Sequence, residues 1–112
     1  MKRELRVKKH PEFDHIIQTG RKYRSERFTL YCEKVLDQKH SRIGIAVGKR
    51  NGGAVTRVRI KRQIRAMLAK RNEYALPMNL IIVVRQTYHV DEFTASEQEL
   101  NTLLDQIKEQ FN

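Results

Sequence analysis

The sequence predicts a two-layer sandwich of α+β or α/β type whose elements follow the order α-β-β-α-β-α. Two segments alternate apolar and polar residues, as half-buried strands do, and two later segments repeat apolar residues at helical spacing. Between those two helices lies the apolar run Leu80–Val84, which is typical of a strand covered on both faces. A strand, a helix and a covered strand in succession imply helices packed on a sheet. We expect residues 1–112 to form a single domain with one core.

The start of the chain predicts a basic arm followed by a short helix. Residues 1–9 are mostly charged, and we expect them to form a mobile arm. Pro11 suits the first turn of a helix, where its missing N–H costs nothing, and Gly20 is a natural stop. A helix over residues 11–19 gathers three apolar side chains on one face, Phe13, Ile16 and Ile17.

Two strands are expected next, over residues 27–35 and 42–48. In the first, one face carries Phe28, Leu30 and Cys32, and the other carries Thr29, Tyr31 and Glu33. In the second, three branched apolar residues alternate with the small residues Gly44, Ala46 and Gly48. A row of such small side chains lets another element approach the sheet closely.

The second half begins with a turn at Asn51-Gly52-Gly53, which leads into a helix over residues 54–71. The covered strand is expected over residues 79–85. The last helix is expected to begin near Asp91 or Thr94, because Thr94 and Glu97 have the spacing of a capping box. Its core stripe consists of Leu100, Leu103, Leu104, Ile107 and Phe111.

The positive charge of the chain is concentrated in its first two thirds. Residues 1–71 contain 21 basic and 6 acidic residues, a net charge of +15, whereas residues 72–112 contain 2 basic and 7 acidic residues, a net charge of −5. No acid occurs between Gln38 and Asn72, where eleven Lys and Arg residues lie. Charges of one sign repel one another, so this pattern indicates a polyanionic partner, either nucleic acid or an anionic membrane.

The sequence argues against a membrane partner. The longest apolar run, Leu80–Val84, is far shorter than the roughly 20 residues that a spanning helix needs, and no apolar stretch follows the basic start. The single cysteine, Cys32, cannot form an internal disulfide, which fits a reducing compartment. Its alternation with Phe28 and Leu30 predicts a buried thiol. We therefore expect a cytoplasmic protein.

The helix over residues 54–71 carries most of the uncompensated charge. At about 100° per residue, its core face consists of Ile60, Ile64, Met67 and Leu68. The remaining surface carries six cations and no acid: Arg57, Arg59, Lys61, Arg62, Arg65 and Lys70. Solvated helices normally interleave Glu with Lys in i,i+4 pairs, so this surface favours a polyanion. Val58 interrupts the cations, away from the core face.

The segment Gly53–Arg65, which reads Gly-Ala-Val-Thr-Arg-Val-Arg-Ile-Lys-Arg-Gln-Ile-Arg, resembles the signature of the bacterial ribonuclease P protein. The core of that signature is usually written Arg-Asn-Arg-x-Lys-Arg-x-x-Arg. The other elements agree in order, including the Phe-containing first helix and the pair Phe28 and Tyr31. Val58 departs from the family pattern, which has Asn, so the role of that Asn is not transferred to it.

The resemblance implies a fold and a function. Family members have an α/β sandwich like domain 2 of ribosomal protein S5, with an unusual left-handed β-α-β crossover around the basic helix. They are the protein subunit of ribonuclease P, the endoribonuclease that removes the 5′ leader from precursor tRNA. The RNA subunit is expected to perform the chemistry with Mg²⁺, without an organic cofactor or a catalytic protein residue. The protein is expected to bind the RNA subunit and the leader, and to promote metal and substrate binding.

The RNA contacts implied by the resemblance form two groups. The signature helix supplies Arg57, Arg59, Lys61, Arg62 and Arg65. The leader cleft and its flank supply Phe13, Ile17, Tyr31, Lys49 and Arg50. Tyr31 lies on the strand face opposite Phe28, where an aromatic ring can stack on unpaired bases. For Phe13, packing in the core is an equally open interpretation.

Three other functions fit parts of the pattern. A structural ribosomal protein has a similar basic build, but such proteins often carry long basic tails, whereas the last residues here are acidic. A helix-turn-helix DNA-binding module needs two adjacent helices, whereas strands flank the basic helix. A protein nuclease needs clustered carboxylates or His pairs, and the four histidines are scattered at His10, His15, His40 and His89.

Overall fold

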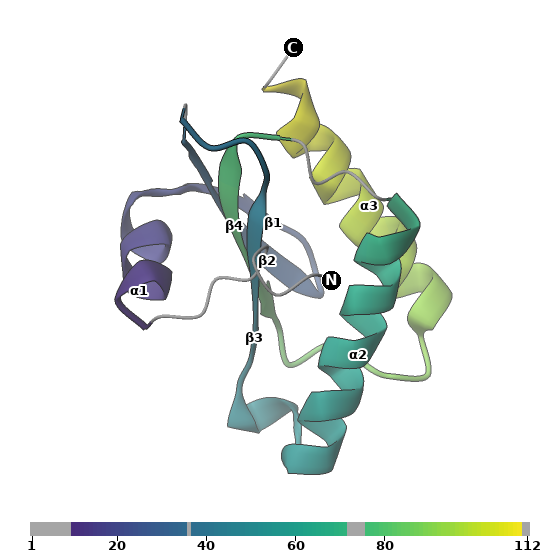
Figure 1. The fold of residues 1–112 in the computed structure, drawn as a ribbon. Coiled ribbons are helices and arrows are strands. Elements are labelled where there is room, and N and C mark those ends of the chain that lie inside the picture. Colours follow the sequence, from purple (N-terminus) through teal and green to yellow (C-terminus); the bar gives the residue numbers. More distant parts are fainter. Residues whose placement is uncertain (1–9, 36, 72–75, 111–112) are drawn as a thin grey trace.

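The computed structural model describes residues 10–35, 37–71 and 76–110, which form a four-stranded mixed sheet with helices on both faces (Figure 1). Its elements are α1 (His10–Thr19), β1 (Arg21–Arg24), β2 (Phe28–Lys34), β3 (Arg42–Val47), the 3-10 helix η2 (Lys49–Asn51), α2 (Ala54–Arg71), β4 (Met78–Val84) and α3 (Phe93–Glu109). The predicted fold class is confirmed: the sheet and the pair α2 and α3 form the two main layers, α1 covers the other face, and the strand β1 is additional. The predicted arm and Phe111 lie outside the described residues.

The strands follow the order β1-β2-β4-β3 across the sheet. β2 is antiparallel to β1 and β4, whereas β3 is parallel to β4. In Figure 1, β3 lies in front of β4 and runs downward, and α2 returns upward on the right-hand side of the sheet. The β3-α2-β4 crossover is therefore left-handed, as the family resemblance implied, although right-handed crossovers strongly predominate in proteins.

The main core lies between the sheet and the pair α2 and α3. The apolar faces of β2 and β4 meet those of the two helices there, and every predicted core residue of α2 is buried. The buried apolar residues of these two helices are Ile60, Ile64, Met67, Leu68, Leu100, Leu103, Leu104 and Ile107. Each large apolar side chain that is fully buried contributes about 1.5–3 kcal/mol relative to an exposed one, so these faces fix how α2 and α3 sit on the sheet.

Helix α1 covers the opposite face of the sheet. Its residue Ile16 is buried against Ile81 of β4, which confirms that β4 is covered on both faces. The helix ends where predicted, because the Gly20 N–H donates to the Ile16 carbonyl oxygen at 2.7 Å. A Cβ atom at position 20 would lie 2.5 Å from that oxygen, so only glycine fits this close approach.

The strand β1 was not predicted because its sequence, Arg-Lys-Tyr-Arg, contains a single apolar residue. It is an edge strand that pairs only with β2 in this sheet, and charged residues are common on such edges because they discourage further strand pairing. The predicted capping box was wrong. Helix α3 begins at Phe93, its N-cap residue is Glu92, and no side chain caps it. Glu97 instead forms an ion pair with Lys70 of α2.

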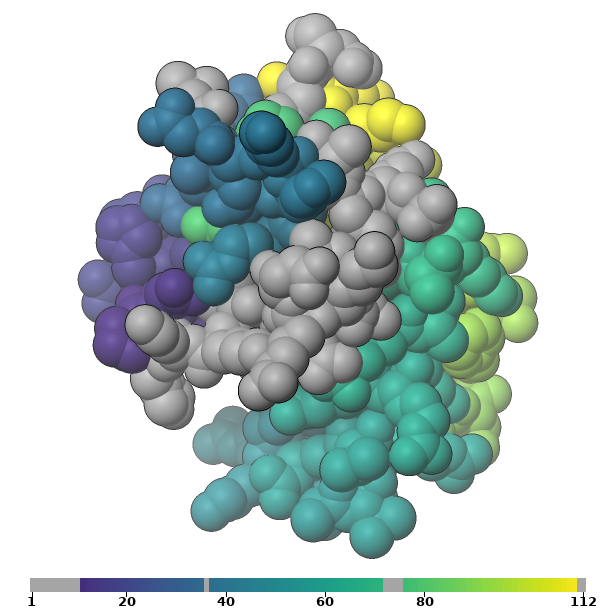
Figure 2. All heavy atoms as spheres, in the orientation of Figure 1, coloured from purple at the N-terminus to yellow at the C-terminus, as the bar shows by residue number. Residues whose placement is uncertain are grey.

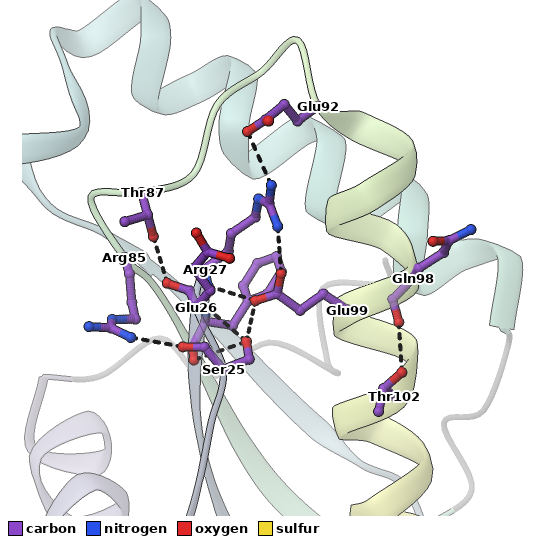
Figure 3. Close-up of polar contacts among 10 residues, drawn as sticks. Ser25, Glu26, Arg27, Arg85, Thr87, Glu92, Gln98, Glu99 and Thr102 are labelled. Carbon is purple, nitrogen blue, oxygen red and sulfur yellow. Dashed lines mark hydrogen bonds and ion pairs between the residues drawn. The ribbon is translucent and has the colours of Figure 1, made fainter.

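The turn between β1 and β2 is fastened to α3 by one carboxylate, Glu99 (Figure 3). This carboxylate accepts hydrogen bonds from the Ser25 hydroxyl, from the Arg27 backbone N–H at 2.6 Å and from the Arg27 guanidinium at 2.7 Å. Burial opposes ionisation of Glu99, but these hydrogen bonds outweigh it and lower the Glu99 pKa below its ordinary value. The edge hairpin is therefore held to the helical layer by a largely buried, charge-assisted contact.

Candidate RNA interface

The outer surface of α2 has the orientation predicted from its helical period. Ile60 is 1% exposed, whereas Val58, two residues earlier, is 54% exposed. The cations Arg59 and Arg62 are exposed, and three more lie half-buried along the flank of the helix: Arg57, Lys61 and Arg65. Figure 2 shows the atoms of α2 along the lower right of the molecule, so this surface faces outward.

The basic residues of the acid-free segment differ in their partners. Three of them form ion pairs with acids from other elements: Arg42 with Glu12, Lys70 with Glu97, and Arg71 with Asp105. In the part of the chain that the structure describes, no acid pairs with Arg57, Arg59, Lys61 or Arg62. The structure therefore separates cations that pair with acids of other elements from cations that no acid neutralises in the described residues.

The two cations before α2 continue this surface. Lys49 and Arg50 are exposed on η2, which connects β3 to α2 at the lower end of the molecule in Figure 1. The Asn51 side-chain amide donates to the Arg85 carbonyl oxygen at 2.9 Å and anchors η2 to the end of β4. Gly52 follows with a positive φ of 134°, a conformation that favours glycine. Lys49 and Arg50 are thus fixed beside the first turn of α2.

The structure divides the second predicted group. Phe13, Ile17 and Tyr31 lie on the α1 side of the sheet, whereas Lys49 and Arg50 lie on η2 beside α2. Phe13 of α1 approaches β3 so closely that a Cβ atom at Gly44 would lie 2.6 Å from its ring. This confirms the predicted close approach at Gly44 and identifies α1 as the neighbour, whereas a Cβ atom at Gly48 would meet nothing within 4 Å. Phe13 and Tyr31 are both half-buried around the pair Ile16 and Ile81, and Ile17 of the same helix α1 is 37% exposed. We call this group of Phe13, Ile17 and Tyr31 the aromatic surface.

One neighbour of Tyr31 was missed from the sequence. Lys22 of β1 lies directly opposite Tyr31 in the strand register, and its Nζ atom lies 6.0 Å from the centre of the Tyr31 ring. In a strand, residues 22 and 24 point to one face and residues 21 and 23 to the other, so the sequence places Lys22 and Arg24 together. This signal could be used only if residues 21–24 were first recognised as a strand.

An acid and a histidine lie on the side of Tyr31 away from Thr29. The Glu33 carboxylate is 2.9 Å from His15 Nε2, and it accepts a hydrogen bond from the Asn79 side-chain amide at 3.2 Å. Glu33 is therefore held in place by α1 and β4, and its negative charge lies near the aromatic surface.

The remaining titratable candidates of the sequence are structural. Cys32 is buried, and desolvation raises the pKa of its thiol to about 11, as expected for an inert thiol. Within the described ranges, no group of three or more His, Cys, Asp or Glu side chains is arranged to hold a metal ion. In the same ranges, no helix is both long and apolar enough to span a bilayer.

Comparison with known proteins places this architecture in a family. The family model described as Ribonuclease P matches residues 1–108. The chain belongs to the ribonuclease P protein family. The ribonuclease P protein component of Mesoplasma florum is 37% identical over 107 residues, which cover 93% of this chain and 96% of that protein. The Macrococcus caseolyticus component is 37% identical over 86 residues, covering 77% and 75% of the two chains.

Solved structures of family members share the fold. The ribonuclease P protein of Staphylococcus aureus superimposes with a TM-score of 0.80 at 28% identity, covering 93% of this chain and 95% of the other. The protein from Thermotoga maritima gives a TM-score of 0.74 at 24% identity, covering 88% and 94%, and supports the fold alone. This protein is thus a ribonuclease P protein subunit with a role in tRNA 5′ processing, and the comparisons favour this role over a structural ribosomal protein.

Proposed function

We propose that the protein binds the RNA subunit of ribonuclease P through α2 and η2, and holds the 5′ leader of precursor tRNA on the aromatic surface. The proposal rests chiefly on one observation, the lack of acid partners in the described residues for the cations Arg57, Arg59, Lys61 and Arg62. Such cations repel one another in the free protein, and RNA phosphates relieve this repulsion.

The chemistry is proposed to occur in the RNA subunit. No described group of side chains fits a divalent metal ion, so we derive no step through a metal bound by the protein. The Mg²⁺ ions that the holoenzyme is proposed to use would be held by RNA. The cations of α2 would assist by neutralising nearby phosphates, so that folded RNA and its bound substrate require less Mg²⁺.

The leader role of the aromatic surface follows from its chemistry. The half-buried ring of Tyr31 packs against the cluster of Ile16 and Ile81, and α1 also carries the exposed Ile17. Proteins that bind single-stranded RNA stack its unpaired bases on such rings. The 5′ leader is a single-stranded extension of precursor tRNA, so this surface suits the leader better than it suits the base-paired tRNA body.

The role of α2 is tested by reconstitution with a bacterial ribonuclease P RNA at low Mg²⁺. The protein should restore cleavage of precursor tRNA, and Arg62→Gln should raise the Mg²⁺ concentration required. The matched control is Lys70→Gln on the same helix, because Lys70 already has an acid partner, Glu97. Equal effects of the two substitutions, or no restoration by the wild-type protein, would contradict the proposal.

The role of Tyr31 is tested with precursor and mature tRNA bound to the reconstituted enzyme. Tyr31→Ala should weaken binding of the leader-bearing precursor by about 1–3 kcal/mol, the contribution of one stacked base, and spare mature tRNA. Tyr31→Phe keeps the ring and serves as the control, with thermal melts to establish folding. Equal losses for the two RNAs would reject the leader role.

A further inference from the structure

We propose that the leader-binding surface continues from Tyr31 across the edge strand β1, where Lys22 and Arg24 form a cationic track for the phosphates of single-stranded RNA. This inference rests on the proposed function of the aromatic surface and extends it to residues that the family signature does not include. We call Lys22 and Arg24 the β1 track.

The register of the sheet places both cations on the correct face. Lys22 pairs with Tyr31 and Arg24 pairs with Thr29, and residues directly opposite in antiparallel strands point to the same side. Both side chains are exposed. Among the residues that the structure describes, neither cation forms an ion pair with an acid.

Helix α1 leaves the β1 edge beside Tyr31 accessible. The helix packs over β2 and β4, and its Phe13 reaches as far as Gly44 of β3. β1 lies at the other edge of the sheet, beyond β2. The exposure of Lys22 and Arg24 shows that this edge is open to solvent on the side of the aromatic surface.

Two other directions from Tyr31 are unfavourable for a polyanion. Toward β4, the cross-strand neighbour Ile81 is fully buried beneath α1. Along β2, the next residue on the same face is Glu33, an acid held by His15 and Asn79. The cation Arg42, also on this face, is already paired with Glu12. An RNA backbone that continues from a base stacked on Tyr31 therefore meets positive charge over β1.

The combination of an exposed cationic edge with the Tyr31 ring suits single-stranded RNA in particular. Proteins that bind single strands place a ring for base stacking beside a positive groove that follows the backbone. The Lys22 ammonium lies 6.0 Å from the centre of the Tyr31 ring, so a base stacked on that ring would have its phosphate within reach of Lys22. Arg24 lies two residues further along the strand, roughly 7 Å away, in position for the next phosphate.

The track is tested in the reconstituted holoenzyme with Lys22→Gln, Arg24→Gln and the double variant, using precursor tRNAs whose leaders differ in length. Each substitution should lower the affinity for long-leader precursors by on the order of fivefold at 0.1 M salt, and reduce the salt slope by about 0.7. Mature tRNA should bind as tightly as it does to the wild-type enzyme. The matched control is Arg21→Gln, which removes the same charge from the same strand but on the opposite face, where Arg21 lies over the Tyr23 ring.

The outcomes separate this inference from the function on which it rests. If Tyr31→Ala selectively weakens leader binding and the double variant does not, the track is wrong and the aromatic surface stands. If neither has an effect in protein that melts normally, the proposed leader surface itself fails. If Arg21→Gln lowers affinity as much as Lys22→Gln does, net charge explains the loss and the track is overturned. An equal loss for mature tRNA would likewise overturn it.

Discussion

Val58 is the residue at which the chain departs from the family signature, and it stands at the surface. Together with Ala54 and the 85% exposed Val55, it forms an apolar patch on the first turns of α2. Arg59 and Arg62 border this patch. Valine offers RNA no hydrogen-bond donor or acceptor here, whereas the Asn usual in the family offers both.

Substitution of Val58 by Asn should leave the melting temperature unchanged, because the side chain contributes little to the core. It should strengthen binding to the RNA subunit by about 2- to 13-fold, since a net hydrogen bond contributes roughly 0.5–1.5 kcal/mol. Val55→Asn is the control, because it adds the same amide to the same patch outside the core of the signature. Weaker RNA binding by Val58→Asn would show instead that the valine packs against an apolar part of the RNA.

At the scale of elements, α2 was predicted over its whole length because a glycine turn, an apolar stripe and a run of cations agree there. β1 could not be predicted, since its residues become a strand only by pairing with Cys32, Tyr31, Leu30 and Thr29 of β2. The start of α3 at Phe93 agrees with the predicted range, but its predicted capping box failed for a related reason. Thr94 and Glu97 have the local spacing of a cap, but Glu97 is engaged by Lys70, 27 positions earlier in the chain.

The contact between the β1-β2 turn and α3 predicts how stability depends on pH. The Glu99 pKa is lower in the folded protein than in the unfolded chain. Ionised Glu99 therefore contributes its full stabilisation above its unfolded pKa, and this contribution is lost as the pH falls through the folded pKa. Glu99→Gln should lower the melting temperature at neutral pH by about 4–8 °C for each kcal/mol lost, and this deficit should shrink on acidification.

The control for this prediction is Glu92→Gln. Glu92 also contacts Arg27, at 3.2 Å, but its side chain is 45% exposed, compared with 17% for Glu99. Exposed ion pairs contribute about 0–1 kcal/mol, so this variant should melt close to the wild-type protein. A pH-independent deficit in Glu99→Gln would show that packing of the side chain, and not its charge, fastens the turn to α3.

At the scale of the whole molecule, the acids of the second half neutralise part of the basic first half. Acids of α3, together with Glu92 just before it, form ion pairs with Arg27, Lys70 and Arg71 on the helical side of the sheet. The sequence shows the charge imbalance but not this division, because the paired residues lie 27 to 72 positions apart. What emerges from folding is a cationic surface over η2 and the outer side of α2.

This division of charge predicts a strong salt dependence for binding to the ribonuclease P RNA. If the surface neutralises about six phosphates, affinity should fall by about 300- to 2,000-fold between 50 and 200 mM salt, because each contact releases condensed counterions. Titrations at several salt concentrations give the slope of log K against log salt.

The double variant Arg59→Gln/Arg62→Gln should reduce the slope by about 1.4–1.8, whereas Lys70→Gln should leave it nearly unchanged because Glu97 already offsets that charge. A flat response in the wild-type protein would exclude phosphate contacts as the source of affinity. A slope lowered equally by Lys70→Gln would show that net charge governs binding, and not the division into partnered and unpartnered cations.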